Sequence, residues 1–102
     1  MSEKKVLAIH PDKTKQGVRI AESKYEQMRA AIVDAFHATD ELGYQEAVAR
    51  VRQSLAGKFD GSIEWYFNAV KHDLEARKIL VRASKSNPVR YRIDRAALKK
   101  QA

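Results

Sequence analysis

The chain has 102 residues, of which 44% are hydrophobic and 32% charged, a composition typical of one soluble globular domain. The absence of cysteine excludes disulfides, thiolate metal sites and a thiol nucleophile. No apolar run approaches the ~20 residues of a membrane span, and the apolar patch in MSEKKVLAIHPDK is too short for a secretory signal. We therefore expect a cytoplasmic protein with no membrane partner.

The net charge of +7 is concentrated at one end of the chain. Residues 77–102 carry nine basic side chains against one acidic side chain, a balance of +8, whereas residues 1–76 carry 11 basic and 12 acidic side chains. This asymmetry favours a polyanionic partner, although a solvated tail would have the same composition. The nine basic residues are Arg77, Lys78, Arg82, Lys85, Arg90, Arg92, Arg95, Lys99 and Lys100.

Two short apolar segments predict strands near the N-terminus, VLAI at Val6–Ile9 and GVRI at Gly17–Ile20. They would form either a hairpin or an extended arm. A capping box at Ser23 and Glu26 then predicts the first helix, although a start near Glu22 fits equally well. This helix should fade around residues 38–40, and its apolar face comprises Tyr25, Met28, Ile32, Ala35 and Phe36.

Gly43 opens a second predicted helix, and Gly57 lies where a left-handed cap commonly ends one. The apolar positions between them are Tyr44, Val48, Val51 and Leu55. Ser62 is placed to cap a third helix. On its helical wheel Phe67, Val70 and Leu74 fall on the side of Ile63.

SIEWYFNAV, in the third helix, contains three consecutive aromatic residues, which cannot all face one core. The wheel makes Phe67 a core residue and Tyr66 a boundary residue, and it turns Trp65 outward beside His72. An exposed tryptophan more often marks a protein contact than a nucleic-acid base. We expect Trp65 and His72 to be covered by the N-terminal arm or by a second chain, as in a homodimer.

After Lys78 the apolar period changes from helical to alternating, which predicts a β-hairpin with one mainly apolar face. Its strands lie on either side of the turn SKSNP, with Ile79, Val81 and Ala83 before it and Val89, Tyr91 and Ile93 after it. Residues 94–100 would add a short helical turn.

Three helices followed by a basic hairpin is the element order of a winged helix-turn-helix. The stretch FDGSIEWYFNAVKHDLEARKILVRASKSNPVRYRI resembles the C-terminal half of a family of small uncharacterised bacterial winged-helix proteins, and VKHDLEARKIL resembles the end of the third helix in many winged-helix regulators. The resemblance, strongest over Tyr44–Ile93, implies a mainly α, α+β fold. We expect a winged-helix domain over residues 21–93, an N-terminal arm over 1–20 and a basic tail over 94–102.

If the family's binding mode carries over, the third helix enters a DNA major groove and the wing lies along the phosphate backbone. Strand alternation predicts that Arg82, Arg90 and Arg92 share one face of the wing, with Lys85 at its tip. Asn68, Lys71 and Arg77 would contact bases or phosphate from the third helix. Against this, Glu64, Asp73 and Glu75 are expected to be exposed on the same helix and to oppose a polyanion.

The function predicted from the sequence is therefore duplex DNA binding led by the wing, as in a small transcription regulator. The alternative is an interaction or homodimerisation module without a DNA function. His10, His37 and His72 are far apart in the sequence, and no hydrolase, metalloprotease or phosphate-loop motif is present. We expect no catalytic activity, no metal and no small-molecule cofactor.

Overall fold

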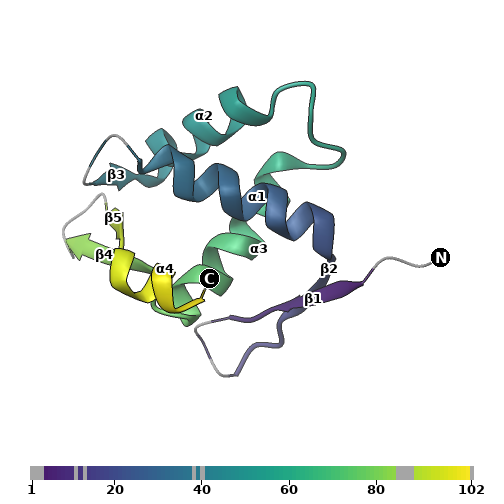
Figure 1. Cartoon of the computed structure of the whole chain (residues 1–102), viewed down its shortest axis with the longest axis horizontal. Coiled ribbons are helices and arrows are strands. Elements are labelled where there is room, and N and C mark those ends of the chain that lie inside the picture. The colour runs from purple at the N-terminus through teal and green to yellow at the C-terminus, as the bar shows by residue number, and fades with distance from the viewer. Residues whose placement is uncertain are drawn as a thin grey trace.

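The structure is a computed structural model that describes residues 4–10, 12, 14–37, 39, 41–84 and 89–101 (Figure 1). Within these ranges the chain has an α+β fold with four helices and two small antiparallel sheets. The elements are, in order, β1 (Lys5–Ala8), β2 (Val18–Ala21), α1 (Glu22–Ala35), β3 (Leu42–Gly43), α2 (Tyr44–Leu55), α3 (Ile63–Ala76), β4 (Leu80–Ser84), β5 (Arg90–Ile93) and α4 (Arg95–Gln101).

The two N-terminal strands pair with each other, so the hairpin alternative is correct. Helix α1 follows β2 without a break, and its N-cap is Ala21. The capping box predicted at Ser23 is therefore wrong, and the earlier start is right. The physical reason is that the backbone amide of Glu22 donates to the carbonyl of Lys4 at 2.8 Å, so the hairpin already satisfies the first helical amide.

The capping residues predicted for α2 and α3 are confirmed. The amide of Gly43 donates to the Glu46 carboxylate at 3.1 Å at the start of α2, and Gly57 after its end has a φ of +72°. Ser62 Oγ accepts from the amide of Trp65 at 3.2 Å, as an N-cap serine does. Helix α3 ends where Lys78 adopts a φ of +65° and the amide of Ile79 donates to the carbonyl of Leu74, so the chain stops winding where the sequence predicts.

The second sheet has three strands in the order β3-β5-β4. The C-terminal hairpin β4–β5 was predicted, but its predicted apolar face is wrong, because Leu80 pairs with Ile93 and Val81 pairs with Arg92. Strand β3 was not predicted, because two residues are too few to show an alternating pattern. Leu42 of β3 pairs with Tyr91, which in turn pairs with Arg82 of β4. This added strand closes one edge of the hairpin and joins it to the start of α2.

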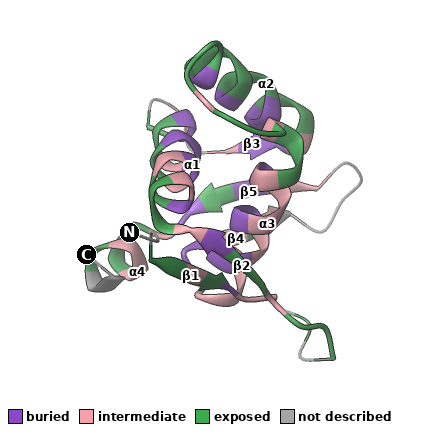
Figure 2. Ribbon diagram, turned by 90° about the vertical axis from the view of Figure 1, so that its right-hand side faces the viewer, coloured by how far each residue is buried: buried purple, intermediate pink, exposed green. Residues whose placement is uncertain are grey.

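One apolar core lies between helices α1, α2 and α3 and the three-stranded sheet, and Figure 2 shows the buried residues on the facing sides of these elements. Ala8 and Ile20 of the N-terminal hairpin belong to the same core. At the other end Asp94 Oδ1 accepts from the amides of Ala96 and Ala97, each at 3.1 Å, and so caps α4. None of the helices formed by the described residues is long and apolar enough to cross a membrane.

Candidate functional site

The arginines of the C-terminal hairpin do not share one face, contrary to the sequence prediction. Arg92 lies opposite Val81, whereas Arg82 lies opposite the buried Tyr91. Directly paired residues of an antiparallel ladder project to the same side, so Arg82 and Arg92 project to opposite sides of the ribbon. Both are exposed, and within the described residues neither forms an ion pair. Lys85, predicted at the tip, lies outside the described residues.

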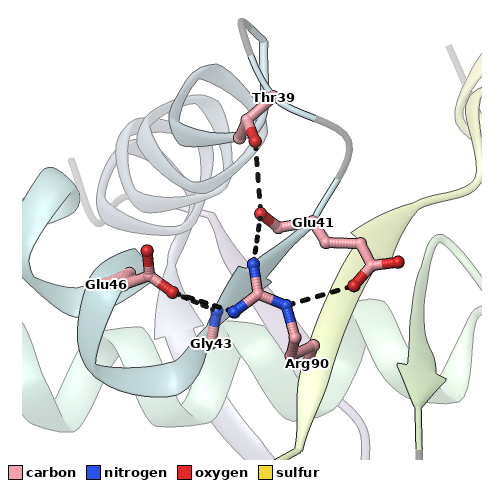
Figure 3. Close-up of polar contacts among 5 residues, drawn as sticks. All are labelled: Thr39, Glu41, Gly43, Glu46 and Arg90. Atoms are coloured by element: carbon pink, nitrogen blue, oxygen red, sulfur yellow. Dashed lines mark hydrogen bonds and ion pairs between the residues drawn. The ribbon is translucent and has the colours of Figure 1, made fainter.

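Arg90 is held by the protein itself (Figure 3). Its Nε donates to the Glu41 carboxylate at 3.1 Å, its Nη2 to the Glu41 carbonyl at 3.3 Å, and its Nη1 to the Glu46 carboxylate at 3.3 Å. The same Glu46 oxygen accepts from the amide of Gly43. Arg90 therefore fastens β5 to β3 and to the first turn of α2, and its charge is already compensated by two carboxylates.

The three residues of the third helix predicted to contact DNA are engaged internally. Lys71 is only 6% exposed, donates to Glu75 at 2.6 Å and lies 5.0 Å from the ring centroid of Tyr91. Asn68 accepts from the Tyr44 hydroxyl at 3.0 Å and donates to the Glu64 carbonyl at 3.0 Å. The guanidinium of Arg77 donates to a buried carboxylate, Asp73, at 2.9 Å.

Asp73 was expected on the surface but is fully buried. It accepts hydrogen bonds from three elements: from the hydroxyl of Tyr25 on α1, from Arg77 at the end of α3, and from the amide of Ile9 just after β1, at 2.9 Å. Burial, and then the bond to Asp73, raise the pKa of Tyr25 far above its ordinary value, so the phenol stays protonated and donates. No local pattern predicts this hydrogen-bond network around Asp73, because its members are up to 64 residues apart.

The carboxylates predicted to repel DNA are thus largely compensated. Asp73 is paired with Arg77, Glu75 is paired with Lys71, and Glu64 is paired with Arg52 of α2. The surface of α3 is less acidic than the sequence suggests, because Asp73 and Glu75 are paired one turn along the chain and Glu64 is paired with another helix.

Trp65 projects outward as predicted, with 51% of its surface exposed. It stands at the rim of a groove of about 220 Å³ between α3 and the N-terminal hairpin. His72, about two helical turns further along, lies in this groove with its ring centroid 4.4 Å from that of His10, which follows β1. The hairpin therefore lies beside both predicted interface residues, but it leaves half of the indole uncovered.

The environment of His72 disfavours its protonated form. Burial is the main cause, followed by the positive charge of Lys71, and together they lower the pKa of His72 below its ordinary value of 6.5. His10 contributes in the same direction, and its Nδ1 accepts from the amide of Asp12 at 3.0 Å. This acceptor role places the proton of a neutral His10 on Nε2.

This pairing of two histidines could not be predicted, because 62 positions separate them and neither belongs to a motif. Among the described residues no group of three or more histidine or acidic side chains could hold a metal ion. The structure thus has two candidate sites. One is a small groove with an indole at its rim and two imidazoles, and the other is the basic ribbon, the hairpin β4–β5 with Arg82 and Arg92 on opposite faces.

A family model matches residues 5–91, which is most of the chain, and its description reads "Family of unknown function (DUF6958)". The chain therefore belongs to this family. Neither the curated proteins nor the solved structures gave a match.

Proposed function

We propose that residues 21–93 form a winged helix and that the protein binds the sugar–phosphate backbone of duplex DNA through its basic C-terminal segment. Support for the fold comes from the order of the elements. Three helices precede the β4–β5 hairpin, and the short strand β3, between the first two helices, pairs with β5 at the centre of the sheet.

The observation that carries the DNA proposal is the uncompensated charge of this segment. Residues 77–102 contain a single acidic residue, Asp94, whose carboxylate caps α4. Arg77 and Arg90 are paired with carboxylates from elsewhere, but Lys78, Arg82, Arg92 and Lys99 are exposed. Such clustered cations attract phosphates and release the counterions that surround DNA.

The two-faced distribution of the arginines suits a ribbon inserted edge-on into a groove. A groove of duplex DNA has a phosphate backbone on each side, so Arg82 and Arg92, on opposite faces of β4–β5, could each reach one of them. A ribbon lying flat on a single backbone would use only one face. Contacts of this kind fix position and add affinity without selecting a sequence.

Sequence readout by α3 is not part of the proposal. The side chains suited to base edges, Asn68 and Lys71, are bonded within the protein, and the N-terminal hairpin is attached to the outer side of the helix through Ile9 and Asp73. We therefore expect similar affinities for duplexes of unrelated sequence.

A fluorescence-anisotropy titration of labelled duplexes against salt tests the proposal. The double change Arg82→Ala/Arg92→Ala should weaken binding and reduce the slope of log K against log salt by about 2, since each lost phosphate contact changes it by about 0.9. The matched control Arg19→Ala/Lys58→Ala removes the same charge from exposed positions elsewhere and should retain the slope. No binding at low salt, or equal losses in the two variants, would refute the proposal.

A further inference from the structure

The groove between α3 and the N-terminal hairpin has the size of a small-ligand site. Its volume is about 220 Å³, larger than an apolar cavity of about 150 Å³ that holds benzene and smaller than the ~300–1,000 Å³ of sites for drug-sized molecules. One substituted six-membered ring fits this volume.

The walls of the groove suit a flat apolar ring. The indole of Trp65 forms one side, and Val18 of β2 and Ala69 of α3 add aliphatic surface. Trp65 is 51% exposed and Val18 is 37% exposed, and both are among the exposed large hydrophobic residues of the described chain. A ring that stacks on the indole would remove this surface from water.

The polar groups of the groove favour an anion. It is lined by His10, Gln16, Asn68 and His72, and no carboxylate side chain is among its lining residues. The His10 Nε2 proton is available, because Nδ1 is occupied by the amide of Asp12. The described part of the chain thus places several N–H donors at the groove and no opposing charge on its walls.

The charged groups around His72 lead to the same conclusion. From α3 it faces Lys71 and Glu75, and from the hairpin it faces His10 and Lys15. Glu75 is already paired with Lys71, and Asp12, whose carboxylate interacts with His10 and Lys15, does not line the groove. An anion beside the two imidazoles would favour the protonated form of His72 and would accept a charge-assisted hydrogen bond from it.

We propose that this groove binds a small aromatic carboxylate, with its ring against Trp65 and its carboxylate at the edge of the contacting imidazoles of His10 and His72. Because the two histidines belong to different elements, such a ligand would fasten the hairpin to α3 beside the existing bond between Ile9 and Asp73. The inference does not depend on DNA binding, since the groove and the basic ribbon share none of the residues used here.

Benzoate is a suitable probe, and ¹H–¹⁵N spectra of the full chain provide the readout. Benzoate should cause saturable shifts of the Trp65 indole N–H and the Gly17 amide. Benzyl alcohol, which has the same ring without the charge, should bind about tenfold more weakly, as expected for the loss of a charge-assisted hydrogen bond. Binding should be tighter at pH 6 than at pH 8, because His72 must take up a proton to hold the carboxylate by a charge-assisted hydrogen bond.

His72→Gln should lower the affinity for benzoate about tenfold, and Trp65→Leu should lower the affinities for benzoate and benzyl alcohol alike. His37→Gln is the matched control, since His37 is exposed beyond the end of α1, and it should bind as the parent does. If Trp65→Leu fails to fold, Trp65→Phe replaces it.

Four results would overturn the proposal: no saturation by benzoate, equal affinity for benzyl alcohol, the same shifts with acetate at equal ionic strength, or equal losses in His72→Gln and His37→Gln. A fifth is a dependence of the Trp65 signal on protein concentration without ligand, together with a dimeric mass by light scattering. That result would assign the groove to a second copy of the chain.

Discussion

The N-terminal hairpin β1–β2 and the C-terminal hairpin β4–β5 are both short antiparallel ribbons, but the core holds them in different ways. The C-terminal hairpin belongs to a three-stranded sheet and buries Leu80, Tyr91 and Ile93. The N-terminal hairpin has two strands and buries Ala8 and Ile20, while Leu7 and Val18 remain exposed (Figures 1 and 2).

Polar contacts reinforce this difference. The N-terminal hairpin is joined to the rest of the chain by the direct continuation into α1 and by the bond from Ile9 to Asp73. The C-terminal hairpin is joined to the rest of the chain by β3 and by the Arg90 contacts to Glu41 and Glu46. Since an isolated two-stranded ribbon is marginally stable, we infer that β1–β2 opens locally at a lower free energy than β4–β5.

The largest effect is expected from the same substitution in the two hairpins. Leu80→Ala removes a side chain that is 3% exposed and should lower the free energy of unfolding by about 2–5 kcal/mol. Leu7→Ala acts on a side chain that is 46% exposed and should change it by no more than about 0.5 kcal/mol. Urea unfolding followed by circular dichroism measures both, and losses of similar size would contradict the comparison.

An intermediate effect is expected at Asp73. Asp73→Ala deprives the Ile9 amide, the Tyr25 hydroxyl and Arg77 of their acceptor and should cost about 1–3 kcal/mol. Hydrogen exchange should accelerate at Ile9 and along β1–β2 more than along β5.

Tyr25→Phe is the control for Asp73→Ala, because it removes one donor to Asp73 and leaves the bond from the Ile9 amide to Asp73 in place. It should lower stability without exposing the Ile9 amide. Unchanged exchange at Ile9 in Asp73→Ala would show that this bond does not hold the hairpin.

A small global effect with a large local one is expected at Gly17. A Cβ there would lie 2.3 Å from the carbonyl oxygen of Ala8, and a backbone atom cannot yield as a side chain can. Gly17→Ala should therefore open β1–β2 while changing the global free energy of unfolding by less than about 1 kcal/mol, since the hairpin opens by itself.

Gly57→Ala should have the opposite combination of effects, with a loss of global stability and no opening of β1–β2. A Cβ at Gly57 meets nothing within 4 Å, but its φ of +72° strains an L-residue and should cost about 1–2 kcal/mol of global stability. Hydrogen exchange along β1–β2 should stay as in the parent protein. If Gly17→Ala and Gly57→Ala gave the same exchange profile, the two hairpins would not be independent.

Local signals predicted the helices well. Ser62 at the start of α3 and Gly57 after α2 act as expected, and the apolar spacing separated the buried Phe67 from the exposed Trp65. Where the prediction was wrong, a distant residue had changed the outcome. The hairpin replaced the serine cap of α1, and the burial of Asp73 followed from partners on two other elements.

Capping residues and apolar periodicity predicted which segments are helical and where α2 and α3 end, because these signals act over a few neighbouring positions. Helix α1 ends at Ala35, before the predicted 38–40. The sequence by itself also determined that the positive charge lies in the last quarter of the chain. Which of these charges remain available depends on how the chain packs. The register of β4–β5 placed Arg82 and Arg92 on opposite faces, packing paired Arg90 with Glu41, and the closure of the N-terminal hairpin brought His10 to His72. These outcomes depend on contacts between residues far apart in the sequence, which no local pattern encodes.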